Sequence, residues 1–151
     1  MSHKFELIIT TPEKQVFNAE VDSVSLPTVT GQITVLAHHL PLSTIIRPGE
    51  MIIRQEGKEE PYAIAGGFIE VQPKQVIVLA DTAEHITEID EAKAQAAIEQ
   101  AKKTQADMNA SGTEYNNLVA KLERDLNRIN IVKKYRHRGH AGIPYEGVKP
   151  D

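Results

Sequence analysis

The sequence predicts a β + α protein: an N-terminal antiparallel β-sandwich followed by a C-terminal antiparallel two-helix hairpin. Up to about residue 86, short apolar segments alternate with turn residues at intervals of about 8 to 12 residues, which is typical of sandwiches and barrels. Beyond that point apolar residues recur at steps of three and four, the period of an amphipathic helix. We therefore expect a sandwich over residues 1–86, a hairpin over 87–136 and a flexible basic tail rich in Gly and Pro over 137–151.

The strands are predicted from alternation and from the turns between them. Residues 5–10 alternate until the turn Thr11-Pro12-Glu13-Lys14 ends the strand. Further runs at 24–26 and 33–36 are separated by turn residues. The runs 51–54 and 61–65 flank a polar tip that suits a β-hairpin, and 68–71 and 76–79 form another pair. We interpret Gly66-Gly67 as a bend or bulge that lets two strands approach closely, because a phosphate cradle would need a helix to begin directly behind the glycines.

The first helix is predicted from Glu88 to Met108, with Thr87 or Asp90 as its N-cap and acidic residues in its first turn. Its expected contact stripe is small. The members of this stripe are Ile89, Ala92, Ala96, Ala97 and Ala101. Such a stripe buries little of the area that yields ~25 cal/mol per Å², against a backbone entropy cost of ~1 to 2 kcal/mol per residue. The hairpin is therefore a candidate moving part.

The second helix is predicted after the break at residues 109–113, where Ser111 and Glu114 have the spacing of a capping box. Its apolar residues recur at helical steps and should face the first helix. They are Tyr115, Leu118, Val119, Leu122, Leu126 and Ile129. Gly139 and Pro144 should end any helix in the tail.

Composition limits the classes of function. The 151 residues include no Cys, which rules out disulfides and thiolate metal sites, and no run approaches the ~20 apolar residues that span a bilayer. No signal or transit segment is evident at the start, so a cytoplasmic protein is expected. Residues 1–87 carry 6 basic and 11 acidic side chains, and residues 113–151 carry 8 and 5. The acidic front lacks the basic face that nucleic-acid binding needs, so no nucleic acid is expected as a partner.

The sequence contains no motif for catalysis. It lacks a phosphate loop that ends in Gly-Lys-Ser/Thr, and it also lacks the motifs His-Glu-x-x-His and Gly-x-Ser-x-Gly. Adjacent His38 and His39 would point to opposite faces of an extended chain and chelate poorly together. We predict no catalytic residues and no metal site.

Several stretches together resemble the ATP synthase epsilon family. The opening Leu7 to Glu13 with Val16-Phe17 is similar to the family's first strand and turn. Leu40-Pro41-Leu42 and Arg47-Pro48-Gly49 resemble two further segments. The most specific matches are Ala65-Gly66-Gly67-Phe68-Ile69-Glu70-Val71, Val78 to Glu84, and Ile89-Asp90-Glu91-Ala92. The resemblance covers nearly all of residues 5–132 and implies the sandwich and hairpin derived above.

The resemblance implies a non-catalytic rotor subunit of the central stalk, on the cytoplasmic side of the membrane and attached to it only through the complex. It would couple the proton-driven ring to ATP synthesis. The sandwich would hold the gamma subunit and the c-ring loop, with Gln32 and His39 as candidate contacts. The second helix, when extended, would reach acidic loops of the beta subunits and inhibit ATP hydrolysis. Its candidate contacts are Lys121, Arg124, Arg128, Lys133 and Lys134; a solvated cationic face is the alternative for each.

Some family members bind ATP through Ile/Leu-Asp-x-x-Arg-Ala on the first helix and arginines on the second. The matching positions here are Glu84, Asp90, Lys93, Arg124 and Arg128. Lys93 replaces the arginine and loses its planar, two-pronged grip on phosphate. No cofactor should be required, and we predict that regulatory ATP binds weakly or not at all.

Two other functions remain as alternatives. In the first, the chain is a free-standing ATP-sensing module whose hairpin closes on the nucleotide, and co-purification with a gamma-like subunit would separate the two interpretations. The second, an enzyme built on a sandwich, would need a cluster of titratable residues that the sequence does not display.

Overall fold

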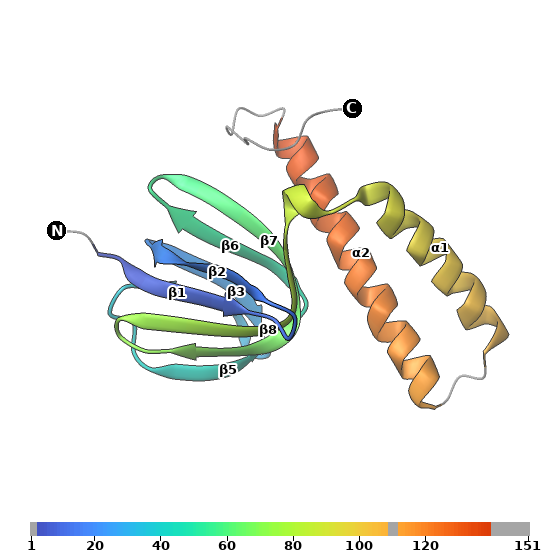
Figure 1. Ribbon diagram of the computed structural model, residues 1–151, viewed down its shortest axis with the longest axis horizontal. Coiled ribbons are helices and arrows are strands. Elements are labelled where there is room, and N and C mark those ends of the chain that lie inside the picture. The colour runs from blue at the N-terminus through green and yellow to red at the C-terminus, as the bar shows by residue number, and fades with distance from the viewer. Residues whose placement is uncertain (1–2, 109–111, 140–151) are drawn as a thin grey trace. The chain divides into compact units, whose positions relative to one another are not determined.

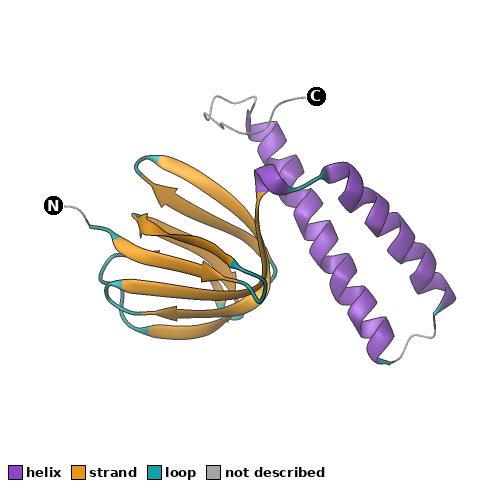
Figure 2. Cartoon of the chain, viewed as in Figure 1, coloured by secondary structure: helices purple, strands orange, loops and turns teal. Residues whose placement is uncertain are grey.

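The computed structural model describes residues 3–108 and 112–139, with the side chains of 137–139 excepted, and has the predicted β-sandwich followed by a helical hairpin (Figures 1 and 2). The chain divides into two compact units, Met1–His85 and Ile86–Asp151, and each is described by itself. The last helix continues to Gly139, past the expected hairpin limit at residue 136. The remainder of the predicted tail, 140–151, lies outside the described residues, as does the predicted capping residue Ser111.

The first unit is built from strands that follow the order β2-β1-β8-β7-β5-β3-β4, with β6 paired to β3 and β7. Neighbouring strands are antiparallel except β1 and β8, which are parallel. The strands are β1 (Phe5–Thr10), β2 (Gln15–Val21), β3 (Ser23–Thr28), β4 (Gly31–Leu36), β5 (Leu42–Ile46), β6 (Gly49–Gln55), β7 (Lys58–Val71) and β8 (Gln75–His85).

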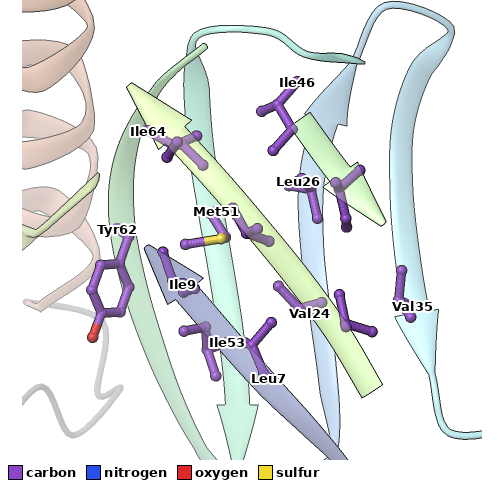
Figure 3. Close-up of a cluster of buried hydrophobic side chains, with 14 of the residues drawn as sticks. Leu7, Ile9, Val24, Leu26, Val35, Ile46, Met51, Ile53, Tyr62 and Ile64 are labelled. Carbon is purple, nitrogen blue, oxygen red and sulfur yellow. The ribbon is translucent and has the colours of Figure 1, made fainter. Parts of the chain in front are cut away.

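The core of this unit comes from the inward side of each strand. Along β1 the predicted alternation holds: Phe5, Leu7 and Ile9 are buried, and the residues between them are partly exposed. Figure 3 shows Leu7 and Ile9 gathered with Met51, Ile53 and residues of other strands in one apolar cluster. Since successive side chains of a strand point to opposite faces, this burial fixes the register of every strand that contributes to it.

Strand β7 serves both layers of the sandwich. Its first half pairs with β6, from Lys58 to Ile64, and its second half pairs with β5, from Gly67 to Val71. The change occurs at Gly66 and Gly67, whose φ values are 65° and 129°. A Cβ on Gly67 would lie 2.3 Å from the carbonyl oxygen of Leu79 on β8. The glycines therefore permit the close approach that the sequence suggested.

The glycine pair forms a bend and not a bulge. Ala65 pairs with Thr82 and Gly67 pairs with Ala80, so no extra residue enters the ladder between β7 and β8. Strand β7 can therefore change partners on one side while it stays in register with β8 on the other.

The second unit begins with a short 3-10 helix, η1 (Ile86–Glu88), followed by helices α1 (Glu91–Asp107) and α2 (Thr113–Gly139). Of the two predicted caps, Asp90 is the N-cap of α1: its side chain accepts a hydrogen bond from the backbone N–H of Lys93 at 3.0 Å. The helices lie side by side (Figure 1), and Gln105 contacts the hydroxyl of Tyr115 near the connecting loop. Arg136 pairs with Glu91 at the other end, so the hairpin is antiparallel.

The contact stripes of the two helices differ in part from the prediction. On α1 the buried residues are Ala94, Ile98 and Ala101; the expected Ala92 and Ala96 are exposed. Alanine occurs on several sides of this helix, so its spacing could not identify the face. On α2, Leu118, Leu122 and Ile129 pack in the interhelical cluster as expected.

Two residues of α2 correct the predicted stripe. Leu126 was expected in the stripe and is 40% exposed, whereas Asp125, which was not, is 2% exposed. At about 100° per residue, Leu126 lies about 40° from Leu122 on one side of the helix, and Asp125 lies about 40° from Ile129 on the other side. The buried stripe on α2 is therefore turned toward the side of Asp125, and it contains a carboxylate.

We predict that Gly67→Ala destabilises the sandwich more than Gly57→Ala. Both glycines have positive φ, but nothing lies within 4 Å of a Cβ on Gly57. Gly57→Ala should therefore cost only the conformational penalty of about 1 kcal/mol. Gly67→Ala adds a clash with the backbone of β8 and should cost at least about 2 kcal/mol more in the free energy of unfolding by urea. Equal losses in the two variants would contradict this account of the bend.

Candidate interaction surfaces

The outer face of the sandwich carries a row of exposed apolar side chains. Ile45 on β5 pairs with Phe68 on β7, and Phe68 pairs with Leu79 on β8. These three residues are 56%, 41% and 53% exposed, respectively. Because directly paired residues point to the same face of a sheet, the three form one continuous row across three strands. We call them the apolar row.

Neighbouring positions extend this surface. Val29, which is 45% exposed, donates its backbone N–H to the carbonyl of Ile45 at 3.0 Å. Ile8 on β1 pairs with Ile77 on β8, and both are partly exposed on the outward side of their strands. Contiguous exposed apolar surface of this kind is uncommon on a soluble protein outside sites of contact with a partner.

Carboxylates border the apolar row. Glu70 is exposed two residues beyond Phe68 on the same strand face, and Asp81 is exposed two residues beyond Leu79. Glu6 is partly exposed on the outward side of β1. An apolar centre with an acidic border suits a partner that offers an apolar patch bordered by basic groups.

The chain from Ser23 to Ile46 contains no Asp, Glu, Lys or Arg. In this segment Leu36, the last residue of β4, is 59% exposed, and Leu40, beyond the end of β4, is 80% exposed. The backbone at this end is held by a hydrogen bond from the N–H of His38 to the carbonyl of Pro73. The segment therefore offers a second, uncharged surface at one end of the sandwich.

The two residues predicted to contact a partner in this region lie at different ends of β4. Gln32 is exposed near the start of the strand. His39 follows the end of the strand, is partly buried, and its Nδ1 lies 2.7 Å from the carbonyl oxygen of Leu40. The structure therefore does not bring Gln32 and His39 together at one point.

The basic residues predicted to contact a partner are distributed along α2. Lys121, Lys133 and Lys134 are exposed, whereas Arg124 and Arg128 are partly buried. Arg128 donates through Nη1 to Oδ1 of Asp125 at 3.1 Å. The lysines are the more accessible charges of the set.

The predicted nucleotide-binding residues are divided between the units. Glu84 lies on β8 in the first unit, and Asp90, Lys93, Arg124 and Arg128 lie in the hairpin. Asp90 caps α1, and Arg128 is paired with Asp125. Within residues 3–108 and 112–139, no hydrogen bond or ion pair joins Lys93 to Arg124.

The prediction from sequence missed the apolar row. A signal was present, because Val76 to Ala80 is apolar at consecutive positions and a strand with only one buried face would alternate. What the sequence could not show is that Ile45, Phe68 and Leu79 are cross-strand partners.

In the described parts of the chain, no helix is long and apolar enough to span a membrane.

The sequence is similar to those of ATP synthase epsilon chains over most of its length. Residues 4–86 match the family described as ATP synthase, Delta/Epsilon chain, beta-sandwich domain. The ATP synthase epsilon chain of Herpetosiphon aurantiacus is 41% identical over 133 residues, which cover 88% of this chain and 97% of that one. The epsilon chain of Roseiflexus sp. is 48% identical over 91 residues, covering 60% of this chain and 66% of that one.

Solved structures show the same fold. A chain of the Euglena gracilis mitochondrial ATP synthase, in a structure of OSCP, F1 and the c-ring, superposes with a TM-score of 0.69 at 23% identity, covering 91% of this chain and 83% of that one. A chain from the central stalk and c-ring of the Tetrahymena thermophila mitochondrial ATP synthase gives a TM-score of 0.56 at 15% identity, covering 89% and 97%.

Proposed function

Because this chain belongs to the ATP synthase epsilon chain family, we propose that it is a non-catalytic subunit of the central stalk that couples rotation of the c-ring to ATP synthesis. The observation that carries the proposal is the apolar row of Ile45, Phe68 and Leu79, exposed on the face of a sheet and bordered by carboxylates. A rotor subunit transmits torque only while it is attached to the shaft, so it needs such a surface for a permanent partner.

The gamma subunit is the proposed partner of the apolar row. Exposed Ile, Phe and Leu side chains on adjacent strands give a rigid apolar patch, and desolvated aromatic and aliphatic side chains dominate the binding energy of stable interfaces. The border of Glu70 and Asp81 would favour a basic rim on gamma. The uncharged end of the sandwich around Leu36 and Leu40 is the proposed contact for the c-ring loop.

The hairpin is the proposed regulatory part. When α2 extends from α1, its accessible Lys121, Lys133 and Lys134 would meet acidic loops of the beta subunits and oppose rotation in the direction of hydrolysis. The small contact residues of α1, Ala94 and Ala101, support this role because they bury little apolar area. The protein would lie on the cytoplasmic side of the membrane and be attached to it only through the complex.

We predict that Phe68→Ser weakens binding to the gamma subunit by about tenfold or more, because it removes an aromatic anchor from the centre of the patch. Glu13→Gln, an exposed change in the turn between β1 and β2, is the matched control and should leave affinity unchanged. The free energy of unfolding should change little in either variant, since Phe68 points outward. Titration calorimetry with purified gamma tests this, and unaltered affinity of the Phe68 variant would refute the assignment of the row.

We predict that deleting residues after 112 raises ATP hydrolysis by the complete complex while binding to gamma is retained. The deletion removes α2 and its basic residues but leaves the sandwich whole. Hydrolysis rates of complexes reconstituted with full-length and shortened chains measure the effect. If the two rates are equal, the hairpin does not regulate hydrolysis.

We predict that ATP binds the isolated chain more weakly than micromolar. Lys93 lacks the planar donor fork of arginine, and Arg128 already pairs with Asp125. Lys93→Arg should strengthen binding by roughly tenfold. Lys103→Arg, the same change at another exposed position of α1, should not. Calorimetry that finds micromolar affinity for the unaltered chain would overturn the prediction.

A further inference from the structure

A single carboxylate lies within the apolar face that α2 presents to α1. Asp125 follows Leu122 by three residues and precedes Ile129 by four, which puts it on the same side of the helix as these two members of the interhelical cluster. Asp125 is 2% exposed, so it is as deeply buried as they are. The members of the cluster on α1 are Ala94, Ile98 and Ala101, whose side chains carry no hydrogen-bond donor.

Among the residues that the structure describes, only one oxygen of this carboxylate has a hydrogen-bond partner. Oδ1 accepts a hydrogen bond from Nη1 of Arg128, one turn further along α2, at 3.1 Å. Oδ2 is buried and accepts no hydrogen bond from any residue that the structure describes. The side chain of Arg128 is 24% exposed, against 3% for that of Asp125, so the cation keeps access to water that the anion loses.

This arrangement costs free energy in the closed hairpin. A charged group that leaves water must recover its lost hydrogen bonds inside the protein, and an unsatisfied buried acceptor carries its full desolvation penalty. An ion pair repays the desolvation of its members only when the remaining lone pairs are also satisfied. The pair with Arg128 leaves Oδ2 without a donor, and the alanine-rich face of α1 supplies little apolar burial to offset the loss.

We propose that Asp125 is a built-in destabilising element that keeps the closed hairpin near its opening threshold. When α2 separates from α1, the carboxylate recovers its hydration, so the open form is favoured relative to a hairpin with a small apolar residue at this position. The destabilisation of the closed hairpin follows from the contacts of Asp125 alone. The further inference that this destabilisation regulates the motor rests on the proposed function.

Amide hydrogen exchange of the full-length chain tests the proposal, under conditions in which exchange reports the opening equilibrium. Asp125→Ala should slow exchange of the α1 amides by about tenfold or more, because it removes the unsatisfied acceptor. Asn130→Ala is the matched control: Asn130 is exposed on the same helix, and Asn and Asp have similar helix propensities. It should slow exchange by no more than about threefold, the effect of propensity alone.

The direction in which the exchange rate of the α1 amides changes decides whether the buried carboxylate destabilises the closed hairpin. Faster exchange in the Asp125→Ala chain would mean that the pair with Arg128 stabilises the closed hairpin, and slowing no greater than in the control would mean that the buried carboxylate costs nothing. Either result overturns the proposal. Amides of β8 in the sandwich should exchange alike in all three chains and report any general change in stability.

The regulatory consequence has a separate readout. In the complete complex, Asp125→Ala should raise ATP hydrolysis, because a larger fraction of hairpins stays closed and leaves the motor free. If exchange slows as expected but deletion of residues after 112 leaves hydrolysis unchanged, the proposed regulation fails while the inference about Asp125 stands. If the deletion raises hydrolysis but exchange does not slow, the inference fails and the proposed function stands.

Discussion

The sandwich depends on a close approach between the backbones of the paired strands β7 and β8 at Gly67. A Cβ at this position would lie 2.8 Å from Cα of Ala80 as well as against the carbonyl of Leu79. With glycine there, β7 bends without losing register with β8 and passes from its pairing with β6 to its pairing with β5. One continuous strand thus pairs with both β6 and β5, as β3 also does.

The same bend determines what the protein shows to a partner. Residues beyond it pair with β5 on one side and β8 on the other, so Phe68 lies between Ile45 and Leu79. The next residue, Ile69, is fully buried. Alternation along the strand therefore separates an inner set of side chains that holds the sheets together from an outer set that stability does not require. That outer set is available for binding, which is how a small sandwich can serve a larger assembly.

The hairpin, unlike the sandwich, is held together by few buried side chains. Its helices are held by a short cluster of Ala94, Ile98 and Ala101 against Leu122 and Ile129, with the charged pair Arg136 and Glu91 near one end. A buried carboxylate interrupts the α2 side of that cluster. Elements that must move are drawn from the least stable parts of a structure. Under the proposed function, the sandwich would hold the partner, and the hairpin with its buried carboxylate would be the part that moves.

The sequence by itself determined the two kinds of structure, the strands of the first unit that alternate, and the cap at Asp90, because these depend on residues that are near one another in the chain. Tertiary structure alone decided which side chains meet. The apolar row joins strands whose pairing is non-local, and so it could not be derived from the periodicity of any one strand. The contact face of α1 could not be derived from spacing, since its alanines lie on several sides of the helix. Asp125 has the spacing of a core residue but the charge of a surface residue, so the sequence does not show whether it is buried. Only the packing of the helices shows that it is.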